Sequence, residues 1–126
     1  MSREHVTGIG GVFFRARDPK ALAAWYEEHL GVPLQAGETY AILPESRNTV
    51  WGPFTDDTDY WPAEKQGMVN YTVSDLDAML AQLRAAGVEV DDRVEELEGI
   101  GRFGWAFDPE GNRFELWQPS ALPVEG

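Results

Sequence analysis

Hydrophobic and polar positions in the first part of the chain alternate and then change to a helical period. Residues 8–17 alternate with a period of two, which predicts a β-strand. One face of this strand carries Val12, Phe14 and Ala16, and the other carries Phe13, Arg15 and Arg17. Asp18 and Pro19 suit the N-cap and first turn of a helix that Gly31 ends. Strand and helix therefore follow each other directly.

The helix predicted over residues 19–30 has an apolar stripe that should lie on a sheet. The stripe consists of Leu22, Trp25, Tyr26, His29 and Leu30. Residues 39–54 then predict two short strands around a turn at residues 44–48. The polar loop 55–67 follows and is the best candidate for a linker between two modules.

The same order of elements returns after residue 67. Residues 68–73 predict a strand, and Ser74 or Asp75 starts a helix that stops at Gly87. The apolar stripe of this helix is Leu76, Met79, Leu80 and Leu83. A strand and a charged loop come next, and residues 101–119 predict a hairpin around an Asp-Pro-Glu-Gly-Asn turn.

The repeated order of strand, helix and further strands indicates an internal duplication. We predict one domain of the α+β class over residues 1–126, with modules at about 8–54 and 68–119 joined by loop 55–67. Each module is a βαβββ unit, and the two should form one curved mixed sheet. The concave side of that sheet, a cup, is where a ligand is expected.

Charge and composition narrow the partners. The chain has 22 acidic and 10 basic side chains and a formal net charge of −12, which argues against nucleic acid and anionic membranes as partners and favours a cationic ligand. It has no cysteine, which excludes disulfides and thiolate metal sites. Without a signal-peptide pattern or a long apolar run, the sequence predicts a cytoplasmic protein.

Two stretches of the sequence resemble a known superfamily. "RARDPKALAAWYEEHLGV" and "DPEGNRFELWQP", set within the duplicated order, resemble the glyoxalase, bleomycin-resistance and extradiol-dioxygenase group, the vicinal oxygen chelate superfamily. The resemblance covers residues 8–119 and implies the glyoxalase/bleomycin-resistance fold, a small-molecule ligand and a homodimer. Its metal-dependent members hold a divalent metal through four residues, one from the first strand and one from a late strand of each module.

Only one of the four metal-ligand positions that the resemblance implies carries a residue able to bind a metal. Glu115 matches the late-strand glutamate of the second module, whereas the other positions fall on Gly11, Trp51 and Val69. Since transition-metal sites need about three protein donors, we predict no cofactor and no standard metal site, with a divalent metal on Glu115 as the alternative. His5 precedes the first strand and His29 belongs to the helix stripe, so neither is expected to replace the missing ligands.

Strand parity predicts which side chains share the concave face with Glu115. The predicted ligand-binding set is Phe13, Arg15, Trp51, Tyr71, Phe103, Trp105, Arg113 and Trp117. A regular hairpin would place Trp105 opposite Glu115 and Phe107 opposite Arg113, with Gly104 and Ala106 facing the helix. The turn residues Asp108 and Asn112 are interpreted as turn formers.

The roles of three charged side chains on the predicted concave face stay open. Arg15 either binds a ligand carboxylate or bridges to an acid, and Arg113 is a second ligand candidate. Glu115 is a metal ligand, a catalytic acid or base, or a structural partner of Arg15, Arg113 or a tryptophan N–H.

Two functions therefore stay open. The chain is either a binding protein for a small aromatic or cationic compound, or a metal-assisted lyase, isomerase or dioxygenase that uses Glu115.

Overall fold

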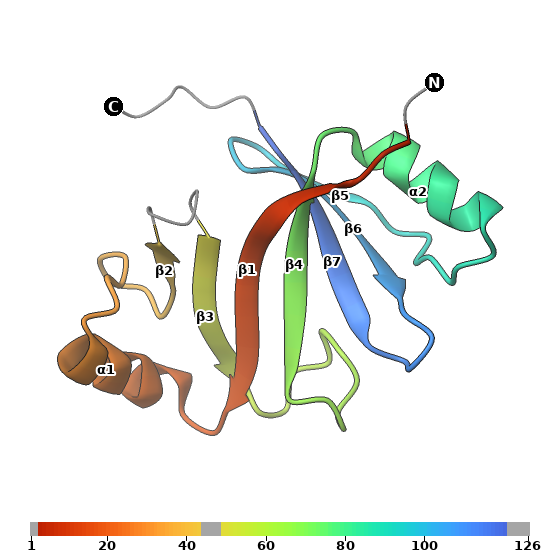
Figure 1. Cartoon of the computed structure of the whole chain (residues 1–126). Coiled ribbons are helices and arrows are strands. Elements are labelled where there is room, and N and C mark those ends of the chain that lie inside the picture. The colour runs from red at the N-terminus through yellow and green to blue at the C-terminus, as the bar shows by residue number, and fades with distance from the viewer. Residues whose placement is uncertain (1–2, 44–48, 121–126) are drawn as a thin grey trace. The chain divides into compact units, whose positions relative to one another are not determined.

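The computed structural model of the protein describes residues 3–43 and 49–120, so the turn predicted at residues 44–48 lies outside the described residues. The chain divides into two compact units. The N-terminal unit is Ile9–Val69, and the C-terminal unit combines Met1–Gly8 with Asn70–Gly126. Figure 1 shows the order of the elements along the chain.

The N-terminal unit is built from three strands and one helix among its described residues. These elements are β1 (Val6–Ala16), α1 (Pro19–Leu30), β2 (Ala41–Leu43) and β3 (Thr49–Thr55). The middle strand β3 pairs in parallel with β1 and antiparallel with β2, so the sheet is mixed. The strands predicted from the period-two pattern are confirmed.

Helix α1 begins and ends where the sequence predicts. The carboxylate of Asp18 accepts a hydrogen bond from the backbone N–H of Ala21 at 3.1 Å, and Pro19 opens the first turn. Gly31 ends the helix in the left-handed conformation, with φ of 69°. A side chain with a Cβ disfavours that conformation, which explains the glycine.

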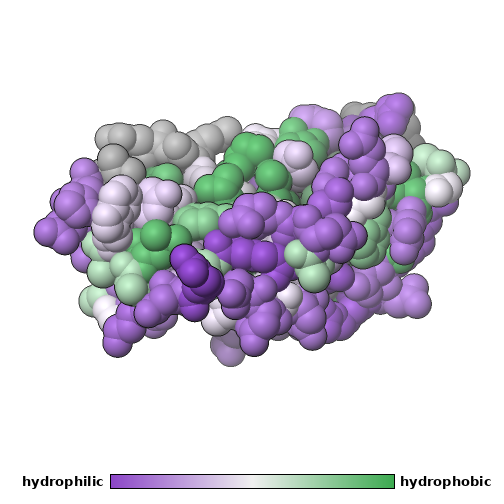
Figure 2. Space-filling view, turned by 90° about the horizontal axis from the view of Figure 1, so that it is seen from below, coloured by the Kyte–Doolittle hydropathy of each residue, from purple (hydrophilic) through white to green (hydrophobic). Residues whose placement is uncertain are grey.

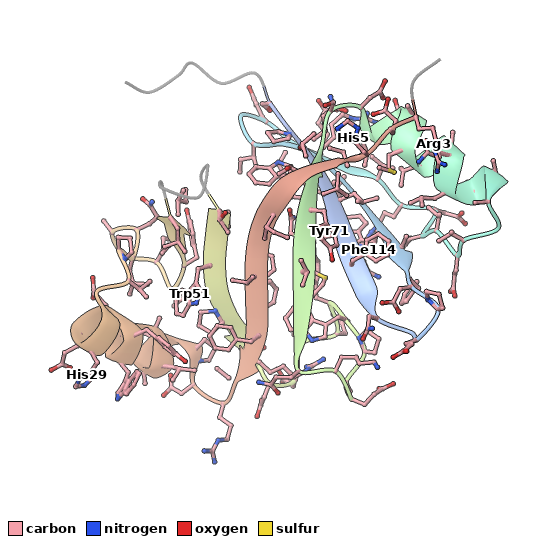
Figure 3. All side chains as sticks on the ribbon, viewed as in Figure 1. Arg3, His5, His29, Trp51, Tyr71 and Phe114 are labelled. Carbon is pink, nitrogen blue, oxygen red and sulfur yellow. The ribbon has the colours of Figure 1, made fainter. Side chains whose placement is uncertain are left out.

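The predicted packing stripe of α1 is wrong for two of its residues. Ala23 is buried and Tyr26 packs on Trp51, with ring centroids 5.1 Å apart. Trp25 is 49% exposed, and its ring lies 4.8 Å from that of His29 on the outer side of the helix (Figure 3). Small Ala23 lets the helix lie close to the sheet, which turns Trp25 and His29 outward.

The C-terminal unit repeats the order with one more strand. Its elements are β4 (Gly67–Val73), α2 (Leu76–Ala85), β5 (Glu95–Leu97), β6 (Gly101–Phe107) and β7 (Arg113–Pro119). The strands lie in the order β4, β7, β6, β5, with β4 parallel to β7 and the other pairs antiparallel. The C-terminal strand β7 therefore lies between β4 and β6.

The core of the C-terminal unit forms where α2 covers the sheet. Asp75 caps α2 by accepting a hydrogen bond from the N–H of Ala78, and the stripe residues Leu76, Met79 and Leu80 are buried as predicted. A Cβ added to Gly104 would lie 3.2 Å from the side chain of Leu80. Gly104 therefore faces the helix, as expected, because the helix needs that space.

The β6–β7 hairpin confirms the predicted register. Trp105 pairs with Glu115 and Phe107 with Arg113. In the turn, the carboxylate of Asp108 accepts hydrogen bonds from the backbone N–H groups of Glu110 and Asn112, both at 2.9 Å. Asp108 and Asn112 are thus turn formers.

The prediction for residues 87–100 is wrong in where it placed the strand. The segment expected to be a strand contributes a single bridge, from Val90 to Ala106, whereas β5 lies in the part predicted as a charged loop. All three residues of β5 are exposed, so hydrogen bonds to β6 form this edge strand without a hydrophobic pattern.

The α+β class and the repeated strand-helix-strand order are confirmed in each unit, and neither helix of the described ranges is long and apolar enough to cross a membrane. The concave cup depends on how the two units are arranged and stays a prediction. Figure 2 shows a face that is mainly hydrophilic, as the excess of acidic residues leads one to expect.

Candidate functional site

Glu115 is a buried acid held by two side-chain donors. It is 4% exposed and lies on the central strand β7. Its Oε1 accepts a hydrogen bond from Nδ2 of Asn70 at 2.6 Å, and its Oε2 accepts one from Nε1 of Trp105 at 3.0 Å. The neighbours across both strand pairs thus supply the donors, and the predicted tryptophan N–H partner is confirmed. The roles as ligand or base stay predictions.

Asn70 is a site residue that the sequence reasoning missed. It is 2% exposed and pairs with Glu115 across the parallel strands β4 and β7. Its Oδ1 is buried and has no hydrogen-bond partner among the described residues. A lone amide in the otherwise apolar stretch of residues 68–73 was the available signal, because a buried amide needs partners.

We call the face of the C-terminal sheet that carries Glu115 the Glu115 face. Strand register places eight side chains of β4, β6 and β7 there, namely Asn70, Thr72, Phe103, Trp105, Phe107, Arg113, Glu115 and Trp117. The four members of the predicted set in β6 and β7 therefore share a face with Glu115, as expected.

Tyr71 does not share this face, so its predicted place is wrong. It pairs with Leu116 and packs edge-on against Phe114, with ring centroids 6.0 Å apart, on the side covered by α2 (Figure 3). The residue of β4 opposite Glu115 is Asn70, not Val69. A shift of one residue moves every side chain of a strand to the other face.

The same one-residue error affects Trp51. Its ring lies 5.4 Å from Phe14 and 5.1 Å from Tyr26, so it belongs to the layer between the sheet and α1 (Figure 3). Phe13 pairs with Gly52, and its ring packs on Phe54 at 5.3 Å. The predicted grouping of Trp51 with Phe13 is therefore wrong.

Arg15 binds backbone carbonyl groups of one loop with its whole guanidinium. Its Nε, Nη1 and Nη2 donate five hydrogen bonds of 2.9–3.1 Å. The acceptors are the carbonyl oxygens of Asp56, Thr58, Trp61, Pro62 and Lys65. Since a guanidinium has five N–H donors, none remains for a ligand carboxylate. Both predicted roles are wrong here, because the partners are carbonyl groups instead of a ligand or an acid.

Aromatic contacts complete this anchoring. The guanidinium carbon of Arg15 lies 5.2 Å from the ring centroid of Trp61, which is 2% exposed. Trp61 in turn packs on Phe54 at 5.0 Å and donates from Nε1 to the carbonyl of Lys65. The loop predicted as a linker is thus packed as part of the N-terminal unit.

Trp105 is the centre of a charged cluster on the Glu115 face. It is fully buried, and the guanidinium carbons of Arg93 and Arg113 lie 5.0 Å and 5.1 Å from its ring centroid. Arg113 also forms a salt bridge of 3.3 Å with Asp91. The Trp105 ring therefore contacts protein cations, so it is not a surface on which a ligand stacks. Arg93, which the sequence analysis did not select, belongs to this cluster.

Phe103 and Trp117 give the Glu115 face its aromatic surface. Their rings are nearly parallel, at 4°, with centroids 5.8 Å apart, and both side chains are only partly buried. The Nε1 of Trp117 donates to the carbonyl of Ile100 at 2.9 Å. These two rings are oriented by the strands and keep exposed surface that a flat ligand can contact.

A separate open groove of about 940 Å³ lies at the start of α1. Its lining includes Arg15, Arg17, Leu22, Trp25, Tyr26 and Gln66. Arg15 is the one member of the predicted set there, and its donors are all engaged. The groove is open to solvent, and its other lining residues do not form an enclosed polar group that could fix a ligand. Its geometry therefore supports no function.

The donor set does not fit the divalent metal that the superfamily resemblance implies. The helix caps Asp18 and Asp75 mark equivalent positions of the two modules. Five residues before each cap, Phe13 of the first module pairs with Gly52, and Asn70 of the second module pairs with Glu115. These four positions offer one carboxylate and one amide. Across the described ranges no group of three or more His, Cys, Asp or Glu residues could hold a metal ion. About three donor side chains are needed for such a site.

His5 and His29 do not change this result. His5 is exposed, and His29 is 51% exposed on the outer side of α1, where it lies 3.8 Å from Glu28 (Figure 3). Neither histidine belongs to the strands that form the Glu115 face.

The fold and site define an α+β protein of two repeated modules, in which a hydrogen-bonded acid occupies the last strand of the second module. A family model described as a glyoxalase-like domain matches residues 11–117, and the chain belongs to this family. The resemblance found in the sequence is confirmed.

Comparison with individual proteins gives more distant likenesses. Putative glyoxylase CFP32 of Mycobacterium bovis is 28% identical over 111 residues, which cover 81% of this chain and 40% of that protein. The chain thus spans less than half of that relative. Methylmalonyl-CoA epimerase from Mycobacterium tuberculosis superimposes with a TM-score of 0.66 at 22% identity, covering 95% and 93% of the two chains. The Streptomyces coelicolor epimerase gives 0.65 at 17% identity, covering 93% and 100%. These structures share the fold.

Proposed function

We propose that the chain is a binding protein for a small molecule, that the ligand lies on the Glu115 face, and that binding needs no divalent metal. The observation that carries the proposal is the position of Glu115. Its two oxygens accept hydrogen bonds from Asn70 and Trp105, while the equivalent strand pair of the first module holds Phe13 and Gly52. A carboxylate fixed in this way can orient a ligand through hydrogen bonds without coordinating an ion.

The chemistry of the face supports an aromatic ligand. Phe103 and Trp117 present parallel, partly exposed rings, and stacking on such rings adds about 0.5–1.5 kcal/mol beyond the burial of area. The net charge of −12 would also attract a cationic compound to the protein as a whole. A twofold homodimer is the assembly we expect for this binding protein.

A metal-assisted lyase, isomerase or dioxygenase that uses Glu115 is the alternative. It is favoured by the names of the relatives, a glyoxylase and an epimerase, and by the retained carboxylate. The donor set described above counts against it.

We expect the purified protein to contain no stoichiometric divalent metal, because one carboxylate and one amide do not replace the water that such an ion must lose. The measurement is elemental analysis after purification without chelator, together with melting curves with and without EDTA. EDTA should leave the melting temperature unchanged, since there is no metal contribution to remove. A near-stoichiometric metal that disappears in Glu115→Gln would contradict the metal-free proposal and favour the enzyme alternative.

We also expect an aromatic compound to raise the melting temperature, because a ligand of the native state stabilises it by mass action, by about 2.7 kcal/mol at a hundredfold excess over Kd. Trp117→Ala should weaken that compound about tenfold, since one stacking surface is lost. The matched control is Trp25→Ala, which removes an exposed tryptophan from α1. Equal losses in both variants would place the ligand elsewhere.

A further inference from the structure

Arg93 is held against the Glu115 face by two contacts. Its guanidinium carbon lies 5.0 Å from the ring centroid of Trp105, and its backbone N–H donates to the carboxylate of Asp91 at 2.9 Å. The side chain is exposed to solvent. Arg93 lies in the segment between α2 and β5, and its guanidinium lies over the ring of Trp105, which is fully buried.

The donors of this guanidinium are not used by the protein. Within residues 3–43 and 49–120, the Arg93 side chain makes no hydrogen bond and no salt bridge, whereas Arg15 donates five hydrogen bonds and Arg113 pairs with Asp91. The contact with Trp105 holds the guanidinium carbon over the ring, and the N–H groups of the side chain have no partner among the described residues. That geometry suits bidentate binding of a carboxylate.

The carboxylates beside Trp105 already have donors within the protein. Asp91 accepts hydrogen bonds from the backbone N–H of Arg93 and from Nη1 of Arg113, and Glu115 accepts from Nδ2 of Asn70 and Nε1 of Trp105. The Arg93 guanidinium over the same ring still has donors to offer a ligand, and a carboxylate is the group that matches a guanidinium best.

The aromatic pair lies one step further along the same strand. Phe103 and Trp105 are two residues apart on one face of β6, a separation of about 7 Å, and Phe103 stacks on Trp117. We infer that the ligand is an aromatic carboxylate, with its carboxylate on Arg93 and its ring against Phe103 and Trp117. This inference rests on the proposed function and names the class of ligand for that site.

The test compares probes that share a ring and differ in charge. Benzoate and 2-naphthoate, their neutral amides and the matching arylmethylamines are titrated into the full chain by calorimetry. We expect the carboxylates to bind at least about tenfold more tightly than the amides, and the amines to bind most weakly. Arg93→Gln should remove the advantage of the carboxylates over the amides and leave the amides unchanged.

The control is Arg102→Gln, which removes the same charge from strand β6. Arg102 points to the other face of β6, where it forms a 3.0 Å salt bridge with Asp77. Its replacement should leave the affinity for the carboxylates unchanged. Melting curves of both variants without ligand show whether each is folded.

The outcomes separate this inference from the function on which it rests. Amides that bind as tightly as carboxylates, or an Arg93→Gln variant that keeps the preference for carboxylates, would overturn the role of Arg93 while the aromatic binding function stands. Tighter binding of the amines would also overturn it. Failure of all the probes on the wild-type chain would count against both proposals.

Discussion

Replacing Arg15 by lysine should lower the free energy of unfolding by about 2–4 kcal/mol, because hydrogen bonds from a charged donor contribute about 1.5–3 kcal/mol each and are not additive. Lysine keeps the charge but has three donors on one atom. It cannot reach the five carbonyl groups that the planar guanidinium reaches. Chemical denaturation measures the change.

Arg17→Lys is the matched control, because Arg17 is an exposed residue two positions along the same segment. Its stability should stay within about 0.5 kcal/mol of the wild type. Hydrogen exchange gives a second measurement, since the backbone between residues 56 and 66 should lose protection in Arg15→Lys alone. A lysine variant as stable as the wild type, with the loop still protected, would show that the loop is held by its aromatic packing instead.

Trp105→Phe should lower the free energy of unfolding by about 2–3 kcal/mol. Phenylalanine is smaller than tryptophan, so the substitution leaves a cavity at a fully buried position. It also removes the N–H that donates to Glu115 at 3.0 Å. Loss of a hydrogen bond to a buried acceptor costs about 1–3 kcal/mol, and more when the acceptor is charged. The guanidinium groups of Arg93 and Arg113 also lose their larger ring.

Trp117→Phe makes the same chemical change at a more exposed place on the same face. Its indole N–H donates to the carbonyl of Ile100, which water can satisfy when the donor is gone, so we expect a loss below about 1 kcal/mol. Denaturation curves of the two variants give the comparison. If both substitutions cost the same, burial of the Glu115 hydrogen bond has no special importance for stability.

Local signals in the sequence predicted most of the secondary structure. Asp18 and Asp75 cap the helices, and the hairpin register at Glu115 follows from the turn that precedes it. These features depend on neighbours within a few residues, which a sequence displays directly. Strand β5 was missed because its pairing is made by backbone groups, and its exposed side chains carry no pattern.

The site was predicted less well because its residues come from parallel strands. The partners of β7 on β6 are fixed by a short turn, so Trp105 was placed correctly. The partners on β4 are separated from β7 along the chain by α2, β5 and β6, and the register of that pair is set by packing that no short motif encodes. An error of one residue then selected Tyr71 and Val69 in place of Asn70.

The two arginines show a similar limit. Arg15 has the residue type expected for a ligand anchor, and only the folded loop shows that its donors are used internally. Arg93 stands in a charged run that the sequence does not distinguish from an ordinary solvated loop. Contacts between distant segments decide which guanidinium faces solvent.

Arg15 binds peptide carbonyl groups, which every amino acid has. Its hydrogen bonds to the segment from residue 56 to 65 therefore do not depend on the side chains of that segment. Apart from Tyr60 and Trp61, whose rings pack on Phe54, that segment should accept new sequences of equal length while keeping its course. The loop is therefore a suitable place for a library of altered residues of unchanged length, without redesigning the rest of the protein.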